Sequence, residues 1–333
     1  MTASLVASAP GKLILTGEYA VLDGAPAIVL AMNRRAVATR GPNTRLRGSS
    51  PFLIALADEV AQRFGADSIA ARAALEVAVD SSEFYDGAQK LGLGSSAAVT
   101  VAAAAYAIAA QFGDARGHRD ALLAIALAAH ARAQGDRGAR GSGADIAAAV
   151  YGGAIIYKMA TEGLSLPTIE RGRWPHTVTL IPFFTGASAD TAALVSQVEA
   201  ARQTKRVAVE AALAAIAEAS RATCSALDVQ THADLAATGV LAGLRLAAVA
   251  TDRLAQATGV ALIPGCVAAA RSAMQALGGT AKTTGAGGGD VAIAVIPTTA
   301  DVTKATSLLI ELGCQPLQLS VDDRGVDTRP GAQ

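Results

Sequence analysis

The sequence has few aromatic residues, few cysteines and no excess of charge of either sign. Its 333 residues include 3 cysteines and 4 histidines. Cys224, Cys266 and Cys314 are far apart in the sequence, and none is spaced with a histidine in the way that zinc ligands are. These absences argue against a disulfide framework and against a zinc site, and they fit a reducing compartment.

Basic and acidic residues balance, with 28 Lys and Arg against 28 Asp and Glu, and no basic block contains interleaved aromatic residues. We therefore expect no nucleic-acid partner. The N-terminal stretch MTASLVASAPGK has no apolar segment of the kind that a secretory signal needs. The longest uncharged run, 91–113, is long enough to span a membrane, but its many small residues favour a buried core helix. We expect a cytoplasmic protein without a membrane partner, either a monomer or a homodimer.

The chain is 52% hydrophobic and long enough for two domains. Hydrophobic periodicity and turn residues predict an α+β pattern in both halves, without the regular alternation of a doubly wound sheet. A segment rich in proline, glycine and charge, 159–176, marks a boundary between domains at 1–165 and 176–330. The predicted strands lie within the first 40 residues and at 73–80, 154–158, 177–183, 291–296 and about 316–321. The predicted helices cover 51–66, the run after GLGSSA, 117–135, three stretches between about 189 and 257, 266–277 and 300–312.

Two glycines and two serines, in the stretch GLGSSAA at 92–98, stand directly before the alanine-rich run. The start of a helix presents free N–H groups, and glycines let an anion approach them, so the stretch predicts a phosphate cradle. An ordinary helix capped by Ser95 or Ser96 is the alternative. A Rossmann site is disfavoured because polar residues, not a strand, precede the loop, and a Walker A loop is excluded because no Gly-Lys-Ser/Thr follows.

Three further stretches carry candidate groups. KTTGAGGGD at 282–290 is nearly free of side chains, which indicates either a close approach of another group or a flexible hairpin. APGKLILTGEYAVL at 9–22 contains Lys12 and Glu18, which are either functional or solvated turn charges. GSGADIAAAVYGG contains Asp145, which is either functional or a carboxylate at a helix start.

Taken in order, APGKLILTGEYAVL, GLGSSAA and KTTGAGGGD resemble the three motifs of the GHMP kinase superfamily. The resemblance implies an N-terminal domain like domain 2 of ribosomal protein S5 and a ferredoxin-like C-terminal domain, with ATP between them. It also implies that the residues of the first glycine loop wrap the ATP phosphates: Lys90, Gly92, Leu93, Gly94, Ser95, Ser96 and Ala97.

Within the superfamily, the detail resembles the phosphomevalonate kinase branch. AHARAQG before GSGADIAAAVYGG, TGASADT at 185–191 and a third motif that ends in Asp290 all favour it. The mevalonate kinase branch is the rival. It typically carries a magnesium-binding glutamate in the helix before the catalytic aspartate, whereas residues 121–134 contain no acid and His130 stands in that region. Two departures from the family pattern, DRGAR at 136–140 and Ala144, leave a changed acceptor possible.

The resemblance implies an ATP- and Mg²⁺-dependent kinase that converts 5-phosphomevalonate to 5-diphosphomevalonate. Mevalonate or another small alcohol is the alternative acceptor, and a non-catalytic sensor of ATP and a small molecule is an alternative of a different class. The implied catalytic residues are Lys12 and Asp145, and the hydroxyl group of Ser96 is implied as a ligand of the metal, for which no carboxylate ligand is identified. The implied acceptor-binding residues are Glu18, Tyr19, Arg137, Arg140, Ser142, Gly143, Ser188, Thr191, Lys282, Gly285, Ala286, Gly287, Gly288 and Asp290.

Overall fold

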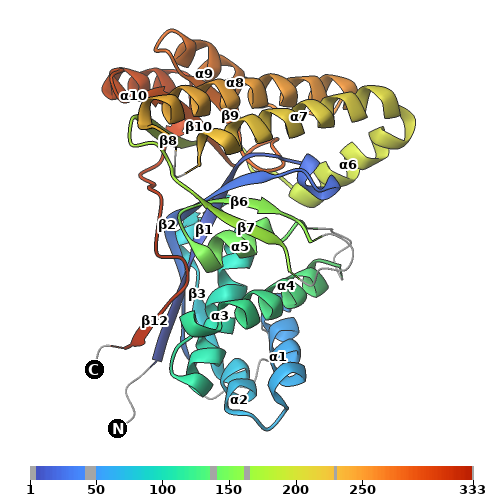
Figure 1. Cartoon of the computed structure of the whole chain (residues 1–333), viewed down its shortest axis with the longest axis vertical. Helices are drawn as coiled ribbons and strands as arrows, with labels where there is room; N and C mark the ends of the chain where they lie inside the picture. Colours follow the sequence, from blue (N-terminus) through green and yellow to red (C-terminus); the bar gives the residue numbers. More distant parts are fainter. Residues whose placement is uncertain (1–4, 42–49, 136–140, 161–165, 229–230, 332–333) are drawn as a thin grey trace.

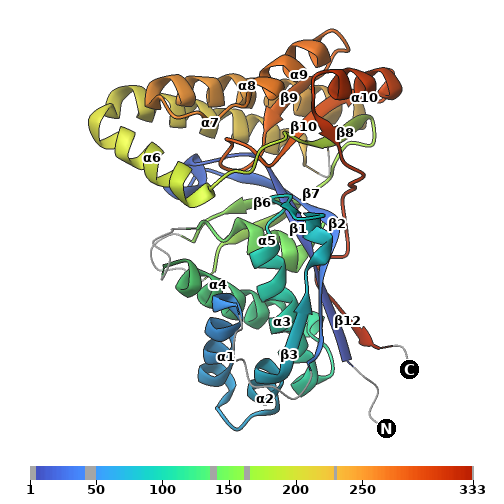
Figure 2. The same ribbon diagram turned by 180° about the vertical axis from the view of Figure 1, so that it is seen from behind.

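The structure, a computed structural model, describes residues 5–41, 50–135, 141–160, 166–228 and 231–331. It consists of two antiparallel β-sheets, each covered by helices, arranged one above the other in Figures 1 and 2. The fold is α+β, as the order of predicted elements indicates.

The lower sheet runs in the order β12-β1-β2-β6-β7, and β3 pairs with the far part of β2. The helices of this half form a layer beside it, in which the third and fifth pack directly on the sheet, and a small hairpin, β4-β5, precedes the third helix. The strands are β1 (Leu5–Thr16), β2 (Ala27–Arg40), β3 (Val77–Asp80), β4 (Tyr85–Asp86), β5 (Gln89–Lys90), β6 (Ala154–Lys158), β7 (Thr168–Gly172) and β12 (Asp327–Pro330). The helices are α1 (Pro51–Phe64), α2 (Ile69–Glu76), α3 (Ser95–Phe112), α4 (Arg119–Gly135) and α5 (Ala144–Tyr151), with short 3₁₀ turns η1 (Ala20–Asp23), η2 (Ser82–Phe84) and η3 (Arg116–His118).

The upper sheet runs in the order β11-β8-β10-β9, and the remaining helices pack around it. Its strands are β8 (Val178–Phe184), β9 (Thr280–Thr283), β10 (Val291–Pro297) and β11 (Gln315–Pro316). The helices of this half are α6 (Thr191–Thr204), α7 (Arg206–Ala226), α8 (Ala233–Thr258), α9 (Gly265–Gln275) and α10 (Val302–Glu311).

Helix α3 is the centre of the lower half. Nearly every side of it is covered, because Ala103, Ala104 and Ala105 are all fully buried although they point in different directions. The small alanine side chains let β1, α1, α2, α4 and α5 all pack closely against it. By length and composition α3 and α8 could each cross a membrane, but 72% and 50% of their apolar windows are buried inside the protein, as in a core helix of a soluble protein.

The predicted strand 73–80 is wrong in its first half. Residues up to Glu76 belong to α2, and only Val77–Asp80 form a strand. Ser68 caps α2 by accepting a hydrogen bond from the backbone N–H of Ala71, and the alanines that follow favour a helix. The alternation of Leu75, Val77 and Val79 therefore crosses the junction of a helix and a strand.

The predicted strand at 316–321 is also mostly wrong, because pairing with β8 ends at Pro316, whose nitrogen carries no hydrogen to donate. The chain then crosses to the lower sheet, where Val321 forms an isolated bridge with Met32. Five strands escaped prediction: β4, β5, β7, β9 and β12. None is longer than five residues, and β9 ends in the first two residues of the stretch that was interpreted as a loop.

A buried ion pair joins the two sheets. Lys282 of β9 contacts the carboxylate of Glu18, which follows β1, and the two side chains are 1% and 2% exposed. The Lys282 ammonium also donates to the carbonyl oxygens of Leu15 at 2.8 Å and Thr283 at 2.7 Å. All three of its hydrogens therefore have an acceptor, which a buried ammonium requires.

We expect Lys282→Ala to lower the free energy of unfolding by about 3–5 kcal/mol, because it leaves the buried Glu18 carboxylate without its cation. The double variant Lys282→Met with Glu18→Gln removes both charges and should lose clearly less. Urea denaturation measures both, with Lys304→Ala, an exposed lysine on α10, as the control. A double variant that is less stable than Lys282→Ala would contradict this interpretation.

Candidate active site

The first glycine loop, residues 92–98, meets β1 at Lys12. The backbone N–H of Lys12 donates to the carbonyl oxygen of Leu93 at 2.8 Å. Gly94 precedes the first residue of α3 with φ of 75°, and a Cβ there would lie 3.0 Å from Cγ and Cε of Lys12. The lysine side chain therefore lies flat across the start of α3, where a larger residue than glycine would displace it.

The Lys12 ammonium stands among charged groups from four segments. The carboxylates of Asp145 and Asp290 favour its charged form, whereas Lys90 opposes it. Burial outweighs the two acids and lowers the pKa of Lys12 below its usual value. Residues that are far apart in the sequence thus meet at one cation.

Asp145 lies in the first turn of α5. Its Oδ1 accepts a hydrogen bond from the backbone N–H of Ile146 at 3.0 Å, and the side chain is half-buried. Gly143 precedes the helix with φ of 81°, and a Cβ there would lie 2.5 Å from Leu127 and 3.2 Å from the hydroxyl oxygen of Tyr157. Tyr157 in turn donates to the carbonyl oxygen of Ser142 at 2.5 Å, which holds the start of α5 against β6.

The second glycine loop, residues 284–290, reaches the same place from the upper sheet. The backbone N–H of Gly285 donates to the carbonyl oxygen of Ile14 at 3.3 Å, and the hydroxyl group of Tyr19 donates to the carbonyl oxygen of Ala286 at 2.7 Å. At its far end Asp290 packs against Gly92, where a Cβ would come within 2.4 Å of the carboxylate. Burial raises the pKa of Asp290, while the N–H of Ala189 and the two nearby lysines act in the opposite direction.

Most glycines of the second loop are needed for contacts within the protein. A Cβ at Gly287 would lie 2.4 Å from the carbonyl oxygen of Leu262, and one at Gly289 would lie 2.7 Å from that of Ala187. A Cβ at Gly288 would lie 2.7 Å from Leu194. Gly285 differs, because its nearest neighbour is the Lys12 nitrogen at 4.0 Å. The close approach that the sequence predicts for this loop is therefore an approach to other parts of the chain. Gly285 is the exception, because it has open space beside it.

Ser96 is held by a histidine on α4. Its hydroxyl oxygen lies 3.1 Å from Nε2 of His130, whose ring is 3% exposed and stacks on Phe52 with centroids 5.0 Å apart. A serine hydroxyl group has one hydrogen and two lone pairs, so a bond to one ring nitrogen leaves it capacity for another partner. His130 therefore orients Ser96 and leaves it able to bind a further group.

The remaining predicted residues fall into four groups. Ser188 is near the first glycine loop, because the side-chain amide of Gln89 donates to its hydroxyl oxygen at 2.5 Å. Thr191 is the exposed first residue of α6. Glu18 and Lys282 are buried against each other, so their charges face one another. Arg137 and Arg140 lie outside the described residues.

Sequence reasoning missed two residues that shape this site, Gln89 and Tyr157. Tyr157 had a signal, because it alternates with Ile156 and Lys158 along β6 and so faces α5 on the other side of the sheet. Gln89 had none, since its contact with Ser188 joins residues 99 positions apart.

The site provides donors for an anion more than ligands for a metal. The start of α3 presents free N–H groups beside the ammonium of Lys12. Within the described residues, no group of three His, Cys, Asp or Glu side chains could hold a metal ion. Mg²⁺ commonly keeps several waters and binds through substrate phosphates together with few protein ligands, so this donor set fits a metal that arrives with a nucleotide.

Three comparisons agree with this arrangement. Residues 52–153 match the family described as GHMP kinases N terminal domain. The chain is 29% identical to a phosphomevalonate kinase from Streptomyces sp. (strain CL190), over 97% of this chain and 98% of that one. It is 31% identical to a mevalonate kinase from Archaeoglobus fulgidus, but over only 58% of this chain and 63% of that one. The crystal structure of Streptococcus pneumoniae phosphomevalonate kinase in complex with phosphomevalonate and AMPPNP superposes with a TM-score of 0.71 at 20% identity, over 95% of this chain and 99% of that one.

We expect Gly92→Ala to destabilise the protein more than Gly87→Ala, by about 1–3 kcal/mol, because only the first substitution pushes against Asp290. Both glycines have positive φ, 73° and 55°, so both variants carry the cost of a left-handed alanine. Gly87 has no heavy atom within 4 Å of its added Cβ, which makes it the matched control. Equal losses of stability in the two variants, in thermal or urea unfolding, would show that the Asp290 side chain moves aside without cost and would contradict this prediction.

Proposed function

The chain belongs to the GHMP kinase superfamily, and from this premise we propose that it transfers the γ-phosphoryl group of ATP to 5-phosphomevalonate. The observation that carries the proposal is the meeting of three motif segments at the Lys12 ammonium, beside the start of α3. The full-length likeness to a phosphomevalonate kinase supports the choice of acceptor. The absence of an acid from residues 121–134, with His130 beside Ser96, favours the same branch over mevalonate kinase.

Phosphoryl transfer requires in-line positioning and compensation of oxygen charge more than covalent chemistry. In our proposal the N–H groups at the start of α3 bind the nucleotide phosphates, together with Lys90 and the first glycine loop. Lys12 lies between the two reacting groups and balances their charge. Because its side chain lies along Gly94, it is held extended before any substrate arrives.

Mg²⁺ would be held by the Ser96 hydroxyl group and the nucleotide phosphates, and when bound it neutralises phosphate charge. The protein's own contribution is the orientation of Ser96. The hydrogen bond between Nε2 of His130 and the Ser96 hydroxyl group, 3.1 Å long, fixes the position of that hydroxyl group. Phe52 holds the imidazole ring in turn.

The acceptor decides what Asp145 has to do. An alcohol must lose a proton on attack, which requires a base, whereas a phosphate monoester has a second pKa near 6 and is already mostly ionised at pH 7. With 5-phosphomevalonate, Asp145 therefore mainly positions the acceptor and supports the charge of Lys12. Acceptor contacts are proposed for Tyr19, Ser142, Gly143, Ser188, Thr191 and Asp290, and for Arg137 and Arg140, which lie outside the described residues.

We further propose that residues 1–165 form the ATP-binding domain and 176–330 the C-terminal domain. Two short strands beyond residue 165, β7 and β12, complete the lower sheet. We also infer that the enzyme works in the cytoplasm, because its three cysteines are free.

We expect Lys12→Ala to lower kcat by about 10²–10³-fold, since it removes the cation that offsets two approaching phosphates. Asp145→Asn, which keeps the side-chain size but not the charge, should lose about tenfold or less if the acceptor is already ionised, whereas loss of a true base costs about 10²–10⁴-fold. Steady-state kinetics with 5-phosphomevalonate gives both values. Equal or reversed losses would count against a phosphate acceptor.

The direct test is ADP release by the purified protein with Mg-ATP and 5-phosphomevalonate, mevalonate, homoserine or galactose. We expect turnover with 5-phosphomevalonate alone. Turnover only with mevalonate would move the protein to the branch of the Archaeoglobus fulgidus relative and would make Asp145 a base. Absence of turnover with all four would overturn the assignment and favour a sensor.

A further inference from the structure

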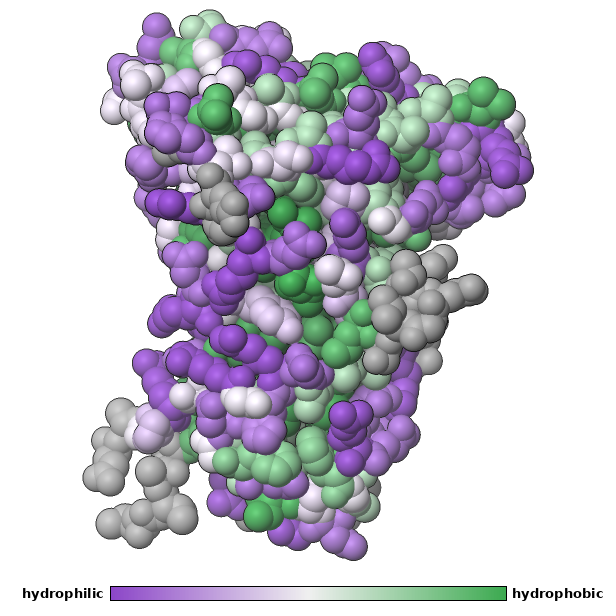
Figure 3. Space-filling model, in the orientation of Figure 1, coloured by the Kyte–Doolittle hydropathy of each residue, from purple (hydrophilic) through white to green (hydrophobic). Residues whose placement is uncertain are grey.

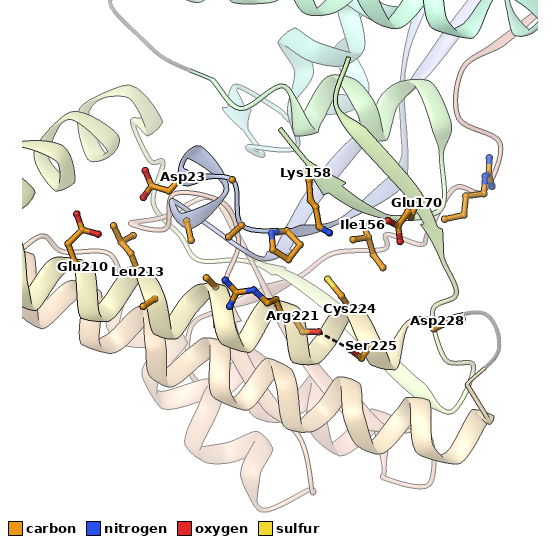
Figure 4. Close-up of a pocket in the computed structure, with 17 residues that line it drawn as sticks. Asp23, Ile156, Lys158, Glu170, Glu210, Leu213, Arg221, Cys224, Ser225 and Asp228 are labelled. Carbon is orange, nitrogen blue, oxygen red and sulfur yellow. Dashed lines mark hydrogen bonds between the residues drawn. The ribbon is translucent and has the colours of Figure 1, made fainter. Parts of the chain in front are cut away.

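A cavity lies on the far side of the lower sheet from Lys12 and Asp145. It has a volume of about 880 Å³, within the range of small-molecule sites, and is bounded by β6, β7, α7 and the segment 20–26. Ile156 of β6 and Glu170 of β7 are directly paired and line it, whereas Tyr157, between Ile156 and Lys158, points to the opposite face and reaches Ser142. The sheet itself therefore separates the cavity from the candidate active site (Figure 4).

Helix α7 provides one wall, and its lining residues recur every three or four positions along a single face. In order they run from Glu210 through Leu213 and Ala217 to Arg221 and Cys224. The middle of this wall is apolar and well packed, because Leu213 is 5% and Ala217 is 7% exposed. Charged groups thus lie at the two ends of an apolar stretch.

Two cations of the lining have no ion pair among the described residues. Lys158 reaches across from β6 toward Cys224, as Figure 4 shows, and its charge acts to lower the pKa of that thiol. Arg221 lies one turn before Cys224 on α7, and its side chain extends along the helix toward Leu213 in Figure 4. Neither Lys158 nor Arg221 has a carboxylate within 4.0 Å among the described residues. Burial raises the pKa of Cys224 to about 11, so the thiol adds no negative charge at neutral pH.

Two acids of the lining, Asp228 and Glu170, lie on the Cys224 side of the cavity; Asp228 has an interaction of its own, and the charge of Glu170 opposes that of Lys158 at the Cys224 thiol. Asp23 and Glu210, at the opposite end, both contact Arg202. Arg171 donates to the carbonyl oxygen of Tyr151 at 2.7 Å. Glu170 lies beyond Lys158 in Figure 4 and has no ion pair among the described residues.

We propose that this cavity binds a small organic anion with one charged head, a phosphate monoester or a carboxylate, and an apolar body of a few carbons. The head lies between Lys158 and Arg221, where charge-assisted hydrogen bonds are available. The body lies over Leu213 and Ala217, and over Pro26 on the facing wall. Acidic groups at both ends of the cavity disfavour a ligand with several negative charges. In the space-filling view, apolar and charged residues are interspersed along the waist between the two halves (Figure 3).

The probes are octyl phosphate and octanoate. Inorganic phosphate, which lacks the apolar body, and octanol, which lacks the charged head, are the control ligands. Calorimetry should show that octyl phosphate, octanoate or both bind with a stoichiometry of one per chain. Inorganic phosphate and octanol should bind at least tenfold more weakly. The bound anion should slow alkylation of Cys224 by N-ethylmaleimide, as read by peptide mass mapping, while Cys266, which does not line the cavity, keeps its rate. Binding of neither octyl anion, or no protection of Cys224, would overturn the proposal.

Variants separate this cavity from the active site. Lys158→Ala and Arg221→Ala should each weaken binding at least tenfold, and Arg221→Lys should retain most of it. Arg171→Ala is the matched control, since its guanidinium is already engaged, and should change binding less than twofold. AMPPNP at saturation should leave probe binding unchanged. Displacement by AMPPNP, or equal losses in Arg171→Ala and Arg221→Ala, would contradict the proposed location. Since no step measures turnover, failure here leaves the proposed kinase function untouched.

Discussion

A lysine ammonium buried between two β-sheets determines how the halves of this protein meet. Lys282 has three acceptors, and two of them, the Leu15 carbonyl oxygen and the Glu18 carboxylate, lie at the end of β1. Tyr19, which follows Glu18, reaches the second glycine loop as well, because its hydroxyl group donates to the carbonyl oxygen of Ala286. The end of β1 is thereby tied to β9 and to the loop after it, and Lys12 earlier in β1 takes its place beside Gly285 as a result.

Alternation along the strands divides the lower sheet into two chemical faces. Lys12 and Tyr157 belong to the face that carries α3 and α5, while Ile156 and Lys158 belong to the face that looks toward α7. The segment 20–26 belongs to both surroundings, because it directly follows Tyr19 and also contributes Ala20, Asp23 and residues 24–26 to the lining of the cavity.

Much of the fold and of the site could be predicted from sequence, since long periodic helices such as α3 and glycine-rich turns carry local signals. The first glycine loop was found in this way, whereas Lys12 and Asp145 were implied by the resemblance of the motifs to a known family; the structure brings the three together. What local patterns could not supply was pairing at long range. Lys282 and Glu18 are 264 residues apart, and no local sequence pattern around either residue indicates that the two charges form a buried ion pair. The four-residue strands β9 and β12 are likewise stabilised by partners, not by their own composition.

The pairing of β12 with β1 has a consequence for biosynthesis. Leu5 pairs with Pro330, so one edge of β1 is covered by a strand that is synthesised long after β1 itself. Until then β1 presents an unpaired edge, which is a template for contacts with other chains. Strand β2 can protect the other edge of β1 early, because it follows within a hairpin. Pairing of β12 with β1 therefore joins strands with a large separation in sequence, the kind of step that slows folding and increases the need for chaperones.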